Sequence, residues 1–261
     1  MSHEWYLYVA MLLASALAGF INTLAGSGSL ITLSLLMFLG LPANVANGSN
    51  RLGVLFQSVV GVATFHKNKQ IDLLKSTWFV VPMVVGASTG AMVAASLSAK
   101  VMEQVIGVIM VLMLFVILFK PEEWLREKTE KTDYKTALNI LIFSAVGFYG
   151  GFIMAGVGVL ILAAMVLRAK YSLKEANAVK LLTVFLFTIP VFLIYVFNQQ
   201  VDWFFGTFIA IGQAFGAWLA ANFAIKSPAA KVWTHRLLIL IVVSSIFKIL
   251  GIWDFLQHYL L

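Results

Sequence analysis

The sequence contains no cysteine and very little charge, and each absence excludes a class of protein. Without cysteine the chain has no disulfide, no thiolate metal ligand and no thiol nucleophile. Charged residues make up 11% of the 261 residues, against about 25% in typical soluble domains. Hydrophobic residues make up 61%, and the mean hydropathy is +0.96. A soluble core could not hide so much apolar surface, so the composition predicts a protein that faces lipid.

Groups that could carry catalysis are also scarce. The four histidines lie in loops or near the chain ends, without the spacing of metal ligands. Aspartate and glutamate stay near the ends of the apolar segments, and no carboxylate pair lies within one. Because general acid–base catalysis and metal catalysis need such groups, we predict that the protein is not an enzyme and holds no metal or cofactor. The net charge of +7 sits in short loops between apolar segments, which excludes a nucleic-acid partner.

Apolar segments recur from end to end of the chain. They lie at about 5–21, 29–40, 44–65, 73–97, 101–119, 137–153, 158–168, 174–197, 203–224 and 233–253. The pattern predicts an all-α polytopic membrane protein with about eight to ten transmembrane segments. One stretch between them, residues 120–136, is strongly charged. We therefore predict a first transmembrane repeat over 1–119, a charged cytoplasmic linker over 120–136 and a second transmembrane repeat over 137–261.

The two halves are related in sequence. A shift of 130 positions aligns polar residues and glycines that apolar composition alone does not explain. The pairs include Gly26 with Gly156, Gly28 with Gly158, Asn47 with Asn177, Asn68 with Asn198, Gln70 with Gln200 and Asp72 with Asp202. Such self-similarity predicts an internal duplication, as found in many secondary transporters.

Two of the apolar segments are too short to cross a bilayer. Residues 29–40 would extend about 18 Å as a helix, well under a hydrocarbon core of about 30 Å. This segment and its counterpart, 158–168, each follow a glycine-rich break. Broken backbone at membrane depth is tolerated where protein or a water-filled cavity surrounds it. We predict a broken helical hairpin plus three spanning helices in each repeat, and full crossings by both hairpin members remain an alternative.

The basic residues predict the topology. With the hairpins in place, 15 of the 18 lysines and arginines fall on one face, which is then cytoplasmic. Arg51 and Lys100 fall on the other face, and Lys248 lies within the last segment. The pattern predicts a bacterial inner-membrane protein with both termini in the periplasm. Since each repeat crosses an odd number of times, the two repeats have inverted topology.

The first candidate site is the break before the second segment. It comprises Asn22, Gly26, Ser27, Gly28 and Ser29, with Gly156 and Gly158 at the matching break. A helix that starts inside the membrane offers unpaired N–H groups and a partial positive charge, which suits an anion. The glycines let the backbone approach closely, and the serines add hydroxyl donors. Tight helix packing at small residues is the alternative explanation for the glycines.

The second candidate site lies at the starts of the third and eighth segments. Asn47, Asn50 and Arg51 occupy the third segment, and Asn177 and Lys180 occupy the eighth. Two cations in one core, approached from opposite faces, would attract an anion from either side. The alternative is snorkelling, in which both long side chains return their charge to the interface. Gln57, Ser58, Thr183, Thr188 and Gln213 are weaker candidates.

Several short motifs carry a resemblance to a known family. They are Gly19-Phe20, the Gly26-x-Gly28 break, Leu41-Pro42-x3-Ala46 and the later echo Gly147-Phe148…Gly156-x-Gly158. Their order and duplication resemble the sulfite exporter TauE/SafE family, over nearly the whole chain. The resemblance implies an inverted-repeat fold and the transport of sulfite, sulfoacetate or related anions. It points to the two Gly-x-Gly breaks and to the Ala-Asn helix starts. Ser27, Ser29 and the pair Asn50-Arg51 depart from the family's usual pattern.

Together these features predict a secondary transporter that exports sulfite or an organosulfonate by alternating access around a site at the membrane midplane. The expected partners are a small anion and the lipid bilayer, and a homodimer is left open. The alternatives are a transporter or channel for another small organic or inorganic anion, and a non-catalytic membrane scaffold.

Overall fold

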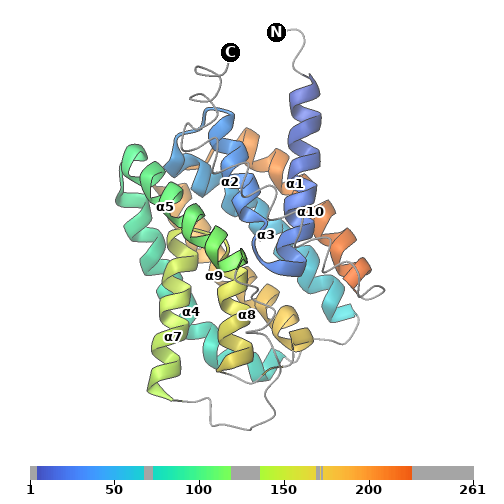
Figure 1. Ribbon diagram of the computed structural model, residues 1–261, viewed down its shortest axis with the longest axis vertical. Helices are drawn as coiled ribbons and strands as arrows, with labels where there is room; N and C mark the ends of the chain where they lie inside the picture. The colour runs from blue at the N-terminus through green and yellow to red at the C-terminus, as the bar shows by residue number, and fades with distance from the viewer. Residues whose placement is uncertain (1–4, 68–72, 119–135, 169–170, 172, 225–261) are drawn as a thin grey trace.

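The computed structural model describes residues 5–67, 73–118, 136–168, 171 and 173–224 of the chain, and these ranges are helical without a strand (Figure 1). The helices are α1 (Trp5–Ala25), α2 (Ser29–Phe38), α3 (Ala43–Lys67), α4 (Leu73–Ser96), α5 (Ala99–Leu118), α7 (Ala137–Phe152), α8 (Val157–Leu167), α9 (Leu173–Phe197) and α10 (Trp203–Ala224). The all-α prediction is confirmed. Nearly all of the charged linker and the tenth apolar segment lie outside the described residues.

The helices have the lengths of membrane segments. Within the described residues, α1, α4, α9 and α10 are long and apolar enough to span a bilayer. Large apolar side chains such as Leu13, Val81 and Phe197 point outward from three of these helices. By contrast, α2 has 10 residues and α8 has 11, and each would reach only about 15–17 Å. Neither short helix crosses the hydrocarbon core alone.

Glycine ends α1 and begins α8. Gly26 has φ +82°, and its N–H donates to the carbonyl oxygen of Asn22 at 2.9 Å. A left-handed residue at this position closes a helix, and glycine adopts it without a Cβ penalty. After α7 the chain is extended at Ile153, and Gly156 turns it with φ +70° into α8. Both predicted breaks are confirmed.

The two breaks touch each other. The N–H of Gly158 donates to the carbonyl oxygen of Gly26 at 3.0 Å. A Cβ added to Gly26 would lie 2.5 Å from the Cα of Gly158. Because backbone lies on both sides of this contact, a side chain at either position would push the two halves of the chain apart.

Substituting Gly26 with alanine therefore combines backbone strain with a steric clash. Gly40 is a matched control, since it also has a positive φ (+91°) but has no atom within 4 Å of an added Cβ. We expect Gly40→Ala to cost about 1 kcal/mol and Gly26→Ala about 3 kcal/mol or more. Thermal unfolding of the purified variants in detergent measures the difference. Equal losses in the two variants would contradict the close contact with Gly158.

Helices of the first half of the chain pack against helices of the second half at glycine residues. α1 lies along α10, and α4 lies along α7 (Figure 1). An added Cβ would collide with the backbone of the facing helix at each of Gly86, Gly90, Gly147, Gly151 and Gly216. The small-residue spacings on α4 and α10 are thus packing contacts.

Helices α3 and α9 pack against each other and hold the candidate site. Both have 25 residues, and they begin at Ala43 and Leu173, 130 positions apart. The starts of α4 and α10, at Leu73 and Trp203, keep the same spacing. The helix boundaries therefore follow the sequence repeat. The inverted relation of the two repeats stays a prediction.

Candidate functional site

Arg51 is bound to the end of a helix from the other half. Asn47, Asn50 and Arg51 share one face of α3, because residues three and four apart are neighbours on a helix. Arg51 is fully buried, and its Nη1 and Nη2 donate to the carbonyl oxygens of Gly150 and Gly151 at 2.6 and 2.8 Å. These carbonyls belong to the last turn of α7, which has no helical donors for them. The guanidinium thus caps the carboxyl end of α7.

Asn47 and Tyr195 complete this cap. The Nδ2 of Asn47 donates to the carbonyl oxygen of Phe152 at 2.9 Å and to the hydroxyl of Tyr195 at 2.7 Å. Its Oδ1 accepts from Nη2 of Arg51 at 3.4 Å. The guanidinium carbon lies 5.5 Å from the centre of the Tyr195 ring, within the range of a cation–π contact. Side chains from α3 and α9 therefore satisfy the last three carbonyls of α7.

Lys180 caps α1 in a similar way. Its Nζ donates to the carbonyl oxygens of Asn22 and Thr23 at 3.3 and 3.1 Å, and to Oδ1 of Asn177 at 2.7 Å. The side chain is 1% exposed. The snorkelling alternative is therefore wrong for both cations, because each lies in the protein interior and is bound to backbone.

The two caps are exchanged between the halves of the chain. α3 caps the broken helix of the second half, and α9 caps that of the first. In each case an asparagine one turn away, Asn47 or Asn177, accepts a hydrogen bond from the cation. Positive side chains are favoured at helix carboxyl ends, which carry about half a negative charge. The structure places each asparagine beside the cation with which the sequence grouped it, but each cation also donates to backbone carbonyls.

The start of α2 has no such cap. Its first residues follow Gly28, which offers no side-chain hydrogen bond, and the same holds for Gly156 before α8. Ser27 is fully buried, and its Oγ has no partner among the described residues. Ser29 accepts a long hydrogen bond of 3.5 Å from Nδ2 of Asn22. A buried helix start with a free hydroxyl beside it is suited to an oxyanion.

Three polar side chains meet beside the first turn of α2. Thr32 and Gln213 both donate to Oδ1 of Asn50, from α2 and α10 respectively. Gln213 was a weak candidate from the sequence, whereas Thr32 and Tyr195 were not predicted. Thr32 follows Ser29 by three positions, so the helical spacing of hydroxyls could have indicated it. Nothing in the apolar sequence around Tyr195 indicates its role.

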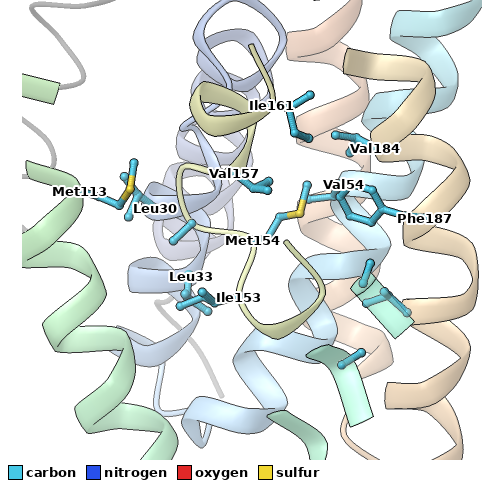
Figure 2. Close-up of a cluster of buried hydrophobic side chains, with 14 of the residues drawn as sticks. Leu30, Leu33, Val54, Met113, Ile153, Met154, Val157, Ile161, Val184 and Phe187 are labelled. Atoms are coloured by element: carbon cyan, nitrogen blue, oxygen red, sulfur yellow. The ribbon is translucent and has the colours of Figure 1, made fainter. Parts of the chain in front are cut away.

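Apolar side chains surround the two breaks. Figure 2 shows apolar side chains from several helices gathered here, among them Leu30, Met154, Val157 and Phe187. These residues are buried members of one hydrophobic cluster. Such surroundings exclude water and strengthen electrostatic interactions, so the charges nearby act over longer distances than at a surface.

The charges around the breaks do not balance. Arg51 and Lys180 are the buried charged residues of the described chain. Among the acidic residues whose side chains are described, Asp202 is half-buried at the start of α10 and Glu103 is exposed. Two helix carboxyl ends contribute about half a negative charge each, and the two helix starts offset them. The described interior therefore holds two basic side chains without a buried carboxylate, and in the described ranges no three His, Asp or Glu side chains could hold a metal ion.

The sequence matches a known family over residues 11–249. The chain belongs to the sulfite exporter TauE/SafE family. It is therefore a membrane transporter, as its relatives are described. The family prediction is confirmed.

Curated relatives cover most of the chain. A "Probable membrane transporter protein" of Haemophilus influenzae is 25% identical over 206 residues, 78% of this chain and 80% of the relative. YfcA of Escherichia coli K12, with the same description, is 27% identical over 220 residues, 84% and 79% of the two chains. ORF9 of Sinorhizobium sp., also so described, is 22% identical over 248 residues, 95% and 94%. No solved structure matches the chain.

Proposed function

We propose that the protein is a secondary transporter that exports a small sulfur-containing anion, sulfite or an organosulfonate, by alternating access. The observation that carries the proposal is the charge balance: two buried cations lie near the helix breaks without a buried carboxylate among the described side chains. An anion would neutralise this interior. The family description names sulfite export, and the names of the relatives specify no cargo.

The anion would bind at the start of α2. Ser27 supplies a buried hydroxyl without another partner among the described residues, and it lies at a helix start, which suits an anion. Arg51 and Lys180 act mainly through their charge, since their donors already bind carbonyls. The one guanidinium donor without a partner among the described residues is Nε of Arg51.

Alternating access would use the contacts between the halves. The Gly26–Gly158 hydrogen bond and the two exchanged caps link each break to the other half. Rocking of one repeat against the other would change the surroundings of the anion while these links keep both breaks at its side.

Binding of the anion can be tested by thermal stabilisation of the purified protein in detergent. A ligand that binds the native state at a hundredfold excess over Kd adds about 2.7 kcal/mol of stability. We expect sulfite or a sulfonate to raise the melting temperature, and Ser27→Ala to reduce this shift. Ser88→Ala is the control, because Ser88 bonds the carbonyl oxygen of Val84 within its own helix. No response to any anion would contradict the proposal.

A further inference from the structure

The cluster of Thr32, Asn50 and Gln213 leaves one buried donor and one buried acceptor unpaired. Oδ1 of Asn50 accepts from Oγ1 of Thr32 at 2.7 Å and from Nε2 of Gln213 at 3.2 Å. Nδ2 of Asn50 and Oε1 of Gln213 have no partner among the described residues. Asn50 is 0% exposed and Gln213 is 1% exposed. Buried polar atoms left unpaired are costly, so these two atoms indicate a missing ligand.

The packing holds the Gln213 amide in place. Gly53 lies one turn after Asn50 on α3, and a Cβ there would be 2.7 Å from Nε2 of Gln213. A Cβ on Gly19 of α1 would be 2.6 Å from the Cα of Gln213. Two glycines on two helices thus make room for this residue. The Gln213 side chain has little freedom to find another partner.

The hydrogen bonds also couple the orientations of the Asn50 and Gln213 amides. Because Thr32 and Gln213 both donate to the amide oxygen of Asn50, the nitrogen of Asn50 is turned away from them. Reversing the Asn50 amide alone would set two NH2 groups against each other. Within each amide the oxygen and the nitrogen are bonded to the same carbon. The unpaired Nδ2 of Asn50 and the unpaired Oε1 of Gln213 therefore flank the one hydrogen bond that joins the two side chains.

A ligand that pairs with both atoms must offer an acceptor and a donor. An oxygen of any oxyanion can accept from Nδ2 of Asn50. A fully ionised oxyanion, however, would leave Oε1 of Gln213 without a donor and would set negative oxygen against it. An oxyanion that still carries a hydroxyl satisfies both atoms.

We propose that this cluster selects a singly charged oxyanion that carries a proton, such as hydrogen sulfite, with its hydroxyl donating to Oε1 of Gln213. The inference rests on the proposed function and narrows its cargo to the protonated form. Thr32 is a positioning residue that orients the amide of Asn50. Since the described side chains include no buried carboxylate, the transported proton travels on the anion itself.

Two anions of equal charge separate this inference from the proposed function. Hydrogen sulfite can donate from its hydroxyl, whereas methanesulfonate has three oxygens and a methyl group on sulfur and no proton to donate. In proteoliposomes we expect the wild type to transport hydrogen sulfite roughly tenfold better or more, because a site built to bond a hydroxyl rejects an analogue without one. At fixed total sulfite, transport should fall as the pH rises and the hydrogen sulfite fraction declines.

Gln213→Met removes the acceptor at nearly constant size, and it should bring the two anions to within about twofold of each other. Gln104→Met is the control for loss of a glutamine, since Gln104 is exposed on α5, outside the cluster, and this variant should keep the preference. Thr32→Val removes one of the two hydrogen bonds that orient the Asn50 amide. It should therefore also reduce the preference for hydrogen sulfite over methanesulfonate.

Equal transport of both anions by the wild type would overturn the inference and leave the proposed function in place. A preference that survives in both Gln213→Met and Thr32→Val would overturn it as well. Absence of transport for every anion would overturn both.

Discussion

Replacing Arg51 with methionine is expected to destabilise the protein by about 3 kcal/mol and to abolish anion transport. The substitution leaves the carbonyl oxygens of Gly150 and Gly151 buried without a donor, at a cost of about 1–3 kcal/mol each. It also removes one of the two buried positive charges. Urea or thermal unfolding in detergent measures the first effect, and flux into proteoliposomes measures the second.

Arg51→Lys separates the two roles. Lysine keeps the charge, but an ammonium lacks the planar fork that reaches two carbonyls at once. We expect this variant to bind anion and to lose part of the stability. Lys100→Met, at an exposed position at the start of α5, is the control for loss of a cation and should leave both quantities unchanged. A normal melting temperature for Arg51→Met would refute the capping role.

Replacing Lys180 with methionine is expected to weaken anion binding about tenfold, because a positive charge disappears from a low-dielectric interior. The carbonyl oxygen of Thr23 also loses its donor, and that of Asn22 keeps only the N–H of Gly26, which should cost about 2 kcal/mol of stability. The anion-induced shift in melting temperature, titrated over anion concentration, measures the affinity.

Lys67→Met is the matched control for Lys180. Lys67 is exposed at the end of α3, so its removal takes away the same charge from a solvated position. We expect it to leave the affinity nearly unchanged. If Lys180→Met weakened the anion no more than Lys67→Met does, the electrostatic role assigned to Lys180 would be excluded.

The sequence predicted the helix ends closely, because glycine and length are local signals. The third and eighth segments were expected at 44–65 and 174–197, and the structure has Ala43–Lys67 and Leu173–Phe197. Gly26 and Gly156 mark the breaks because a left-handed backbone conformation favours glycine, and glycine is visible in the sequence. Spacing along the chain also placed Asn47 with Arg51 and Asn177 with Lys180.

Contacts between distant residues could not be predicted from the chain alone. Arg51 binds carbonyls about a hundred positions away, and backbone acceptors have no sequence signal. The interior position of Lys180 depends on α1 covering it, so periodicity in α9 could not separate burial from snorkelling. Gln213 lies beside Asn50 only because Gly19 and Gly53 admit it, and that is a matter of packing between three helices.

The exchanged caps impose an order on membrane insertion. Thr23 and Lys180 are 157 residues apart, and at roughly 5–20 residues per second the ribosome needs on the order of 10–30 s to make that span. During this interval the end of α1 has no lysine to hold it. α7 differs, since Arg51 is already synthesised when its last turn emerges. The carboxyl end of α1 is therefore capped only after α9 has been synthesised. A nascent chain halted before α9 would expose this uncapped helix end to the quality-control machinery.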